Sequence, residues 1–177
     1  MRTRDTIKQG HEKAVADQLL NALQIRASCA RPGDPNKREP DVMYTWDRKT
    51  LGIEIATAYY TDGDAEQEWT AVAHERPFPA QGIEMREAGV IGNPDQTICE
   101  RIQKEIDDKC GKIYAGADEL WLCIEQQAAL SDAESVERCI ETLKIPAGHQ
   151  FTRIYVSYLA PAHEGSKYSA RQIFPPD

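Results

Sequence analysis

Two acidic side chains near the middle of the chain have the type and the spacing to hold a divalent cation. Asp41 stands at the start of a short apolar run, directly after Pro40. Glu54 lies inside the next apolar run, with isoleucine on each side. A carboxylate in such a strand must face water or a partner, because burying an unpaired charge is costly. Two carboxylates that converge repel each other, and a divalent cation relieves that repulsion.

A β-hairpin would bring these two carboxylates together. The apolar runs at residues 42–46 and 51–58 are rich in β-branched and aromatic side chains, and the polar residues 47–50 separate them. This pattern predicts two antiparallel strands joined by a tight turn. In a hairpin that closes at residues 47–50, Asp41 and Glu54 lie near the same end of the ladder.

A lysine in the second half of the chain occupies a position that is normally apolar. Asn93, Pro94 and Gln96 form a helix-start pattern, and the sequence predicts a helix over residues 93–112. Its apolar stripe consists of Ile98, Ile102, Ile106 and Ile113. Lys109 lies about 20° from Ile98 on the helical wheel, in the middle of this stripe. Such a lysine extends its ammonium to water, pairs with an acid or takes part in chemistry.

An acidic residue of the first predicted helix also faces inward. Residues 6–25 have a helical period, with Ile7, Val15, Leu19 and Leu23 on one stripe. Glu12 lies about 60° from Val15, inside this stripe. It is either exposed at a frayed helix end or directed toward the carboxylates of the hairpin.

The Pro40-Asp41 pair, the hairpin, and Glu54 followed by Ile55 and Ala56 together resemble the core motif of the PD-(D/E)XK nuclease-like superfamily. The resemblance covers about residues 6–125 and implies the restriction-endonuclease-like fold. It implies that Asp41, Glu54 and the backbone carbonyl of Ile55 bind Mg²⁺, for which Mn²⁺ can substitute.

The motif departs from the superfamily pattern at its lysine. The superfamily has a lysine two residues after the glutamate, where this chain has Ala56. Divergent relatives move this lysine to the helix that follows the hairpin, which implies that Lys109 positions the attacking water. The superfamily often supplies an acid from its first helix, which implies that Glu12 binds or orients a second metal or its water.

By this resemblance the expected function is a metal-dependent nuclease that hydrolyses nucleic-acid phosphodiester bonds, with DNA as the expected substrate. A homodimer is the arrangement that such proteins often adopt. Ala56 and the net charge of −8, from 21 basic and 29 acidic residues, favour a catalytically inactive nuclease-fold protein that binds protein or nucleic acid. A third hypothesis is a small-molecule enzyme that uses the same carboxylates.

The remaining sequence predicts one α/β domain over residues 1–177. Its element order predicts a central mixed sheet with helices on both faces, a three-layer sandwich. No apolar run reaches the length of about 18 residues that spans a membrane, so we expect a cytoplasmic protein without a membrane partner. The five cysteines are expected to be reduced thiols. The other predicted elements are a loop at 28–40, a helix at 64–75, a substrate-covering flap at 76–93, strands at 119–125, 150–159 and 170–174, and a helix at 131–143.

Overall fold

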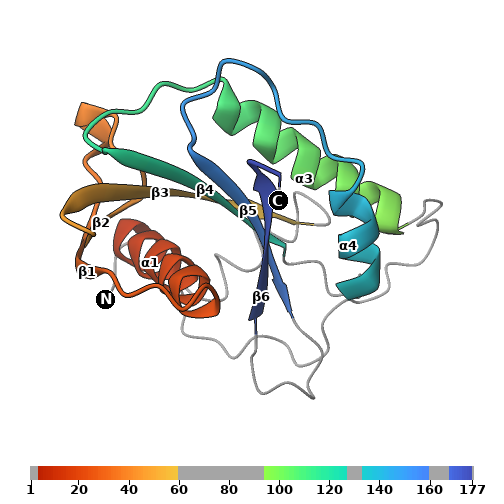
Figure 1. Ribbon diagram of the computed structural model, residues 1–177, viewed down its shortest axis with the longest axis horizontal. Helices are drawn as coiled ribbons and strands as arrows, with labels where there is room; N and C mark the ends of the chain where they lie inside the picture. The colour runs from red at the N-terminus through yellow and green to blue at the C-terminus, as the bar shows by residue number, and fades with distance from the viewer. Residues whose placement is uncertain (1–3, 60–93, 127–132, 160–167, 177) are drawn as a thin grey trace.

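The computed structural model describes residues 4–59, 94–126, 133–159 and 168–176, which form an α/β structure around a six-stranded mixed sheet (Figure 1). The strands lie side by side in chain order, from β1 to β6, and three α-helices of the described part pack against them. The elements are α1 (Arg4–Ala22), β1 (Ser28–Pro32), the 3-10 helix η1 (Pro35–Lys37), β2 (Val42–Trp46), β3 (Lys49–Ala58), α3 (Pro94–Cys110), β4 (Glu119–Gln126), α4 (Ala133–Ile140), β5 (Arg153–Leu159) and β6 (Tyr168–Phe174). The predicted α/β class with a mixed sheet is confirmed.

The predicted hairpin is formed by β2 and β3, which pair antiparallel with Trp46 opposite Lys49. Asp47 and Arg48 form the turn and have positive φ angles of 47° and 63°. Positive φ at both central residues is typical of two-residue hairpin turns, whose twist matches that of the flanking strands. The predicted four-residue turn was therefore too long, because Lys49 and Thr50 are polar but already pair with β2.

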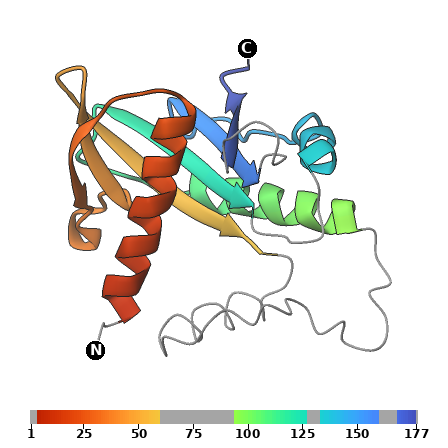
Figure 2. The ribbon, with the colours of Figure 1, turned by 90° about the horizontal axis from the view of Figure 1, so that it is seen from below.

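Strand direction brings the candidate carboxylates to one edge of the sheet. β3, β4 and β5 are parallel, so their carboxyl ends lie at the same edge, as the arrowheads in Figure 2 show. β2 runs antiparallel to β3, and Val42 pairs with Ile53. Asp41, the residue before Val42, therefore lies beside the carboxyl-terminal half of β3, where Glu54 is located.

Alternate residues of β3 belong to two separate apolar clusters. Leu51, Ile53 and Ile55 pack with apolar residues of α1. Ala56 and Ala58 pack instead with apolar residues of α3 and α4. Because side chains alternate along a strand, Glu54 is directed to the same side as Ala56, toward α3. The position of Glu54 in the strand thus points its carboxylate at the helix that carries Lys109.

The predicted loop at residues 28–40 contains a strand and a short helix that the sequence pattern did not indicate. β1 is an edge strand whose five residues are all exposed, so it has no apolar alternation. Asp34 accepts a hydrogen bond from the backbone of Asn36 at the start of η1. Arg31 contacts Glu39 at 2.6 Å across this segment, and the ion pair helps to fix the approach to Pro40.

The predicted apolar stripe of α3 is correct over its first three members and wrong at the fourth. Ile98, Ile102 and Ile106 are fully buried. Ile113 is 66% exposed, because α3 ends at Cys110 and the helical period does not extend beyond it. Cys110, the last residue of α3, is the buried residue that follows these three isoleucines on the helix.

The expectation that all cysteines are reduced thiols was wrong for two of them. Cys99 and Cys139 form a disulfide between α3 and α4, with their Cα atoms 5.4 Å apart. The two residues are separated by 40 positions in the sequence, and only the packing of α4 on α3 brings them together. Cys29, Cys110 and Cys123 are free thiols, and the last two are buried.

The predicted strand at 119–125 corresponds closely to β4, and those at 150–159 and 170–174 to β5 and β6. The predicted helix at 131–143 corresponds to α4, which ends at Ile140, and its first two residues lie outside the described residues. The predicted helix at 64–75 and the predicted flap at 76–93 lie outside the described residues. No helix in the described ranges has both the length and the apolar composition needed to span a membrane.

Candidate functional site

Asp41 and Glu54 are joined through the backbone of the β2–β3 hairpin. The carboxylate of Asp41 accepts a hydrogen bond from the Ile55 N–H at 2.9 Å. The carboxylate of Glu54 accepts one from the Asp41 N–H at 3.3 Å. Both contacts join the residue that precedes β2 to the carboxyl-terminal half of β3. They place both carboxylates at the same end of the hairpin, as the spacing predicted.

A close approach of the backbone holds Asp41 in this position. Gly52 of β3 lies against the ring of Pro40, and a Cβ atom at position 52 would clash with that ring. The same Cβ would lie 3.0 Å from the Cβ of Ala117. The absence of a side chain at position 52 therefore lets Pro40, and with it Asp41, sit directly on β3.

Lys109 reaches Glu54 from α3. Its Nζ atom lies 2.6 Å from Glu54 Oε1, and the two side chains are 15% and 7% exposed. The helix is directed over β3 by its buried isoleucines, which set the side of α3 that faces the sheet. Lys109 follows Ile106 by three positions and so projects from the same side. The lysine thus forms a largely buried ion pair with an acid.

Glu12 borders the same cavity from α1. It is a buried residue, and its Oε1 atom lies 2.9 Å from Nζ of Lys8, one helical turn earlier. An open cavity of about 220 Å³ is lined by Glu12 together with Asp41, Ile55 and Lys109. Four of the five residues predicted for the site therefore line one cavity, and the fifth, Glu54, contacts Lys109 of that lining.

The electrostatics of the site favour a cation. Burial raises the pKa of Asp41, and the negative charge of Glu12 raises it further. Burial likewise raises the pKa of Glu54, followed by the effect of Asp41. The ammonium of Lys109 acts in the opposite direction on both carboxyl groups. Both acids thus retain a raised pKa beside a lysine, and a further positive charge would stabilise their ionised forms.

The donor atoms at this site fit the requirements of Mg²⁺. Within the described residues, no three side chains of His, Cys, Asp or Glu are placed to hold one metal ion. Mg²⁺ is commonly bound by one or two carboxylates and keeps several water molecules, so it needs no third acidic side chain. The N–H and C=O of a strand residue point toward the same neighbouring strand. The Ile55 carbonyl is therefore directed to the side of Asp41, whose carboxylate accepts the Ile55 N–H.

Several residues that line the cavity received no role in the sequence analysis: Lys8, His11, Ala56, Thr57, Tyr59 and Glu105. The sequence spacing could have indicated two of these residues. Lys8 precedes Glu12 by four positions and Glu105 precedes Lys109 by four, the spacing of neighbours on one helix face. Burial raises the pKa of Glu105, and Lys109 opposes that shift. The others depend on where α1 crosses β3, which no local pattern reveals.

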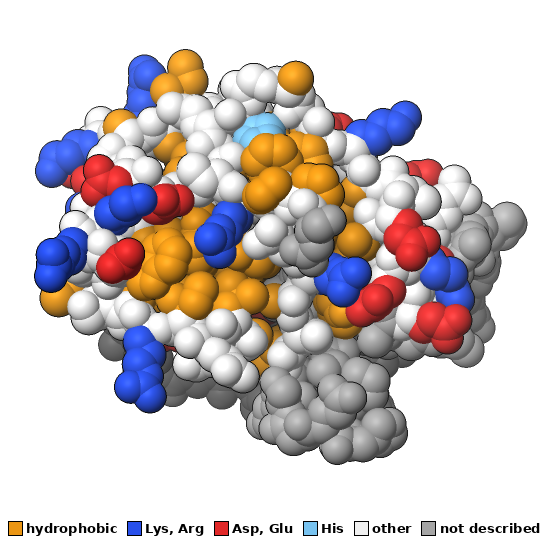
Figure 3. All heavy atoms as spheres, viewed as in Figure 1, with side chains coloured by type: hydrophobic (Ala, Val, Ile, Leu, Met, Phe, Trp, Pro, Cys, Tyr) orange, Lys and Arg blue, Asp and Glu red, His pale blue; other side chains and the backbone are white. Residues whose placement is uncertain are grey.

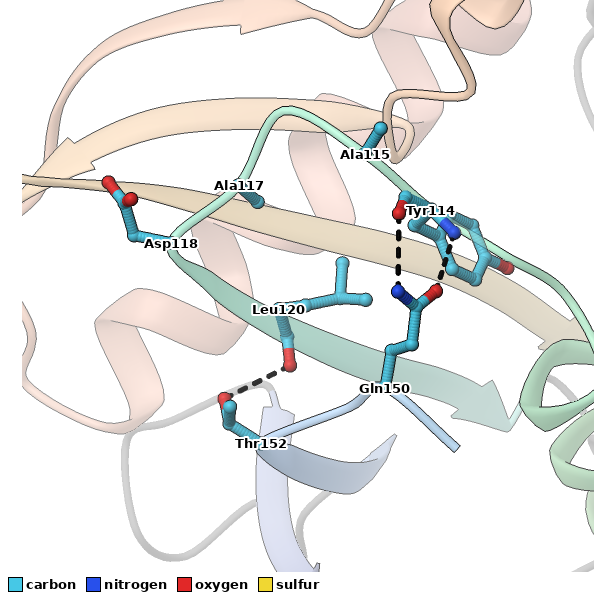
Figure 4. Close-up of a pocket in the computed structure, with 7 residues that line it drawn as sticks. All are labelled: Tyr114, Ala115, Ala117, Asp118, Leu120, Gln150 and Thr152. Carbon is cyan, nitrogen blue, oxygen red and sulfur yellow. Dashed lines mark hydrogen bonds between the residues drawn. The ribbon is translucent and has the colours of Figure 1, made fainter. Parts of the chain in front are cut away.

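A smaller cavity of about 90 Å³ lies between the loop after α3 and the start of β5 (Figure 4). The side-chain oxygen of Gln150 accepts a hydrogen bond from the Tyr114 N–H at 2.7 Å, and its amide nitrogen donates to the Tyr114 carbonyl at 3.4 Å. Thr152 donates to the Leu120 carbonyl at 3.1 Å. These polar groups join two backbone segments, and we assign them a structural role.

Comparisons of the chain with protein-family models, with curated proteins and with solved structures gave no match.

Proposed function

We propose that the protein is a metal-dependent nuclease that hydrolyses nucleic-acid phosphodiester bonds, with DNA as the substrate. The observation that carries the proposal is the contact of 2.6 Å between the Lys109 ammonium and Glu54, beside the cavity that Asp41 and Glu12 line. The expected catalytic lysine position holds Ala56, and a lysine from α3 supplies the missing charge at the same carboxylate. The metal ligands would be Asp41, Glu54 and the Ile55 carbonyl.

The proposed roles follow from the contacts of each residue. A bound Mg²⁺, or Mn²⁺ in its place, would stabilise the negative charge that develops on the phosphate. Asp41 and Glu54 hold the cation, and Lys109 orients the attacking water by donating a hydrogen bond to it. Glu12 binds or orients a second metal or its water, with Lys8 restricting its side chain.

The proposed function goes with the restriction-endonuclease-like arrangement, a three-layer sandwich with helices on both faces of the sheet. Two features support this arrangement. Residues 51, 53 and 55 of β3 pack with α1, whereas residues 56 and 58 pack with α3 and α4. In Figures 1 and 2 the strands are seen between α1 and α3, which supports this arrangement.

The alternative is a catalytically inactive nuclease-fold protein that binds protein or nucleic acid. Ala56 and the net charge of −8 favour it. On the face seen in Figure 3, the Lys and Arg side chains of the described residues are dispersed among acidic ones and form no continuous basic stripe. Nucleic-acid binding depends largely on such basic surfaces.

Metal titration followed by a cleavage assay distinguishes these functions. We expect Mg²⁺ or Mn²⁺ to raise the unfolding temperature of the wild type, and we expect Asp41→Asn and Glu54→Gln to abolish this effect. Asp108→Asn, which changes an exposed acid of α3, is the matched control and should respond like the wild type. Cleavage of single- and double-stranded DNA and RNA is then measured with the same variants.

A nuclease requires cleavage by the wild type and by Asp108→Asn, but not by the two site variants. Metal-dependent stabilisation without cleavage of any of the four substrates would support the binding module instead. If neither metal changes the unfolding temperature, the metal site itself is refuted.

A further inference from the structure

A second polar cluster borders the same cavity and has no part in the proposed metal site. It consists of His11 from α1, Thr57 from β3 and Glu125 from β4. The Nε2 atom of His11 lies 3.0 Å from Oε2 of Glu125. The Thr57 hydroxyl donates a weaker hydrogen bond to the same oxygen at 3.4 Å. His11 and Thr57 line the cavity, together with Glu12, Asp41 and Lys109.

The sheet explains why Glu125 lies where it does. Thr57 and Glu125 are register partners at the carboxyl ends of the parallel strands β3 and β4. Glu125 is only 3% exposed, although it is an acid near the end of a strand. A buried carboxylate is stabilised only when its oxygens accept hydrogen bonds or meet a cation. Glu125 therefore fixes the imidazole of His11 at the edge of the cavity.

The position of His11 on its helix ties it to the metal side of the cavity. It follows Lys8 by three residues and precedes Glu12 directly, and all three residues line the cavity. The His11 side chain is 23% exposed, whereas that of Glu125 is 4% exposed. The imidazole is thus the accessible member of the pair, and the carboxylate behind it is the buried member. This is the arrangement by which a carboxylate holds a histidine in one orientation.

We propose that His11 is a substrate-contacting residue that binds the sugar-phosphate backbone beside the scissile phosphate. Glu125 and Thr57 are its positioning residues. The inference rests on the proposed nuclease function. It assigns the side of the cavity opposite the metal site to binding of the same nucleic acid that the metal site would cut. The metal held by Asp41 and Glu54 would contact the scissile phosphate, while His11 binds the adjoining part of the strand.

The test measures two quantities for each variant. The first is kcat and KM on an oligonucleotide that the wild type cleaves. The second is the Mg²⁺ affinity, measured by calorimetry in the absence of nucleic acid. The variants are His11→Gln, Glu125→Gln and the two combined. Lys13→Gln is the matched control, since it changes an exposed residue of the same helix that pairs with Asp17. The unfolding temperature of each variant is measured in parallel.

We expect His11→Gln to lower kcat/KM by about 10- to 100-fold, the usual range for loss of a hydrogen bond to a charged ligand group. Its Mg²⁺ affinity should stay within about twofold of the wild type, because the metal carboxylates are untouched. Glu125→Gln should lower kcat/KM less. The combined variant should be no worse than His11→Gln alone, because Glu125 acts through His11. A purely structural pair would instead lower the unfolding temperature without a loss of kcat/KM in the folded variants.

Three results would overturn the inference. If His11→Gln and Lys13→Gln both cleave like the wild type while Asp41→Asn and Glu54→Gln are inactive, the nuclease proposal stands and His11 has no substrate role. If the Mg²⁺ affinity of His11→Gln falls as much as its kcat/KM, His11 acts on the metal site. If the wild type neither binds metal nor cleaves, the proposed function fails and this inference fails with it. Should His11→Gln not fold, Glu125→Gln alone must show the loss of kcat/KM at wild-type metal affinity.

Discussion

Replacement of Lys109 by methionine tests whether its ammonium and a metal ion serve the same carboxylates. The ammonium lies 2.6 Å from Glu54 in a largely buried pair. It opposes the rise that burial causes in the pKa of Glu54 and of Asp41. Methionine keeps the length and the unbranched shape of the lysine stem but carries no charge. In the variant, the two carboxylates therefore lose a cation that opposes their burial and their mutual repulsion.

The structure sets the size of the expected effect. Removing one partner of a buried ion pair costs about 3–5 kcal/mol of unfolding free energy. In a chain of this size, each kcal/mol corresponds to about 2–4 °C, so the metal-free variant should unfold roughly 6–20 °C below the wild type. Mg²⁺ at about 100 times its Kd restores about 2.7 kcal/mol. The rise in unfolding temperature caused by Mg²⁺ should be larger in Lys109→Met than in the wild type, because the ion no longer competes with the ammonium.

Thermal unfolding with chelator and with a Mg²⁺ series measures both quantities, and the cleavage assay shows whether turnover is lost as expected. Lys104→Met is the matched control, since Lys104 is an exposed lysine of the same helix. Its unfolding temperature and its response to Mg²⁺ should equal those of the wild type. The reasoning is refuted if metal-free Lys109→Met is as stable as the wild type, or if it binds Mg²⁺ more weakly.

Two further predictions concern Asp41 and its support. Because burial and Glu12 raise the pKa of Asp41, the folded protein holds this proton more tightly than the unfolded chain, so ionisation of Asp41 destabilises the fold as pH rises above about 4. Without metal, the unfolding free energy of the wild type should therefore fall relative to Asp41→Asn between about pH 4 and pH 8 in denaturant titrations, and a constant difference would contradict this. Gly52→Ala should lower both the unfolding temperature and the Mg²⁺ affinity, because its Cβ displaces Pro40. Gly10→Ala is its control: a Cβ there meets nothing within 4 Å, and in a helix it should be neutral or stabilising by up to about 1 kcal/mol. Equal effects of the two alanines would show that Pro40 is not held by Gly52.

The parts of the site that the sequence could predict are those set by local periodicity. The alternation around Glu54 and the helical stripe around Lys109 each restrict one side chain to one side of its element. When α3 packs on β3 through its isoleucines, both restrictions direct the two charges toward each other. The Pro40-Asp41 pair adds a third position, because hairpin pairing fixes where the start of β2 meets β3. The placement of Asp41, Glu54 and Lys109 therefore follows from the strand alternation, the helical period and the hairpin turn.

The parts that could not be predicted depend on contacts between distant elements. β1 is an exposed edge strand, so its side chains have no buried face to produce a pattern. The disulfide needs α4 to dock on α3, and the Cys99 and Cys139 spacing indicates nothing about that docking. His11 and Glu125 each have an ordinary local surrounding in the sequence. Their pairing arises only because α1 crosses the carboxyl ends of β3 and β4.

The charges at the cavity also explain how an acidic chain could act on an anionic substrate. Apart from the pair of His11 and Glu125, four carboxylates gather at the cavity, those of Glu12, Asp41, Glu54 and Glu105. Lys8 and Lys109 supply two ammonium groups against them. When all six are ionised, two negative charges remain, and these repel a phosphodiester. One divalent cation would neutralise that excess, so under the proposed function we expect the binding of metal and the binding of nucleic acid to be favourably coupled. On this proposal, the local charge balance at the cavity, rather than the net charge of −8, determines whether a phosphate can approach.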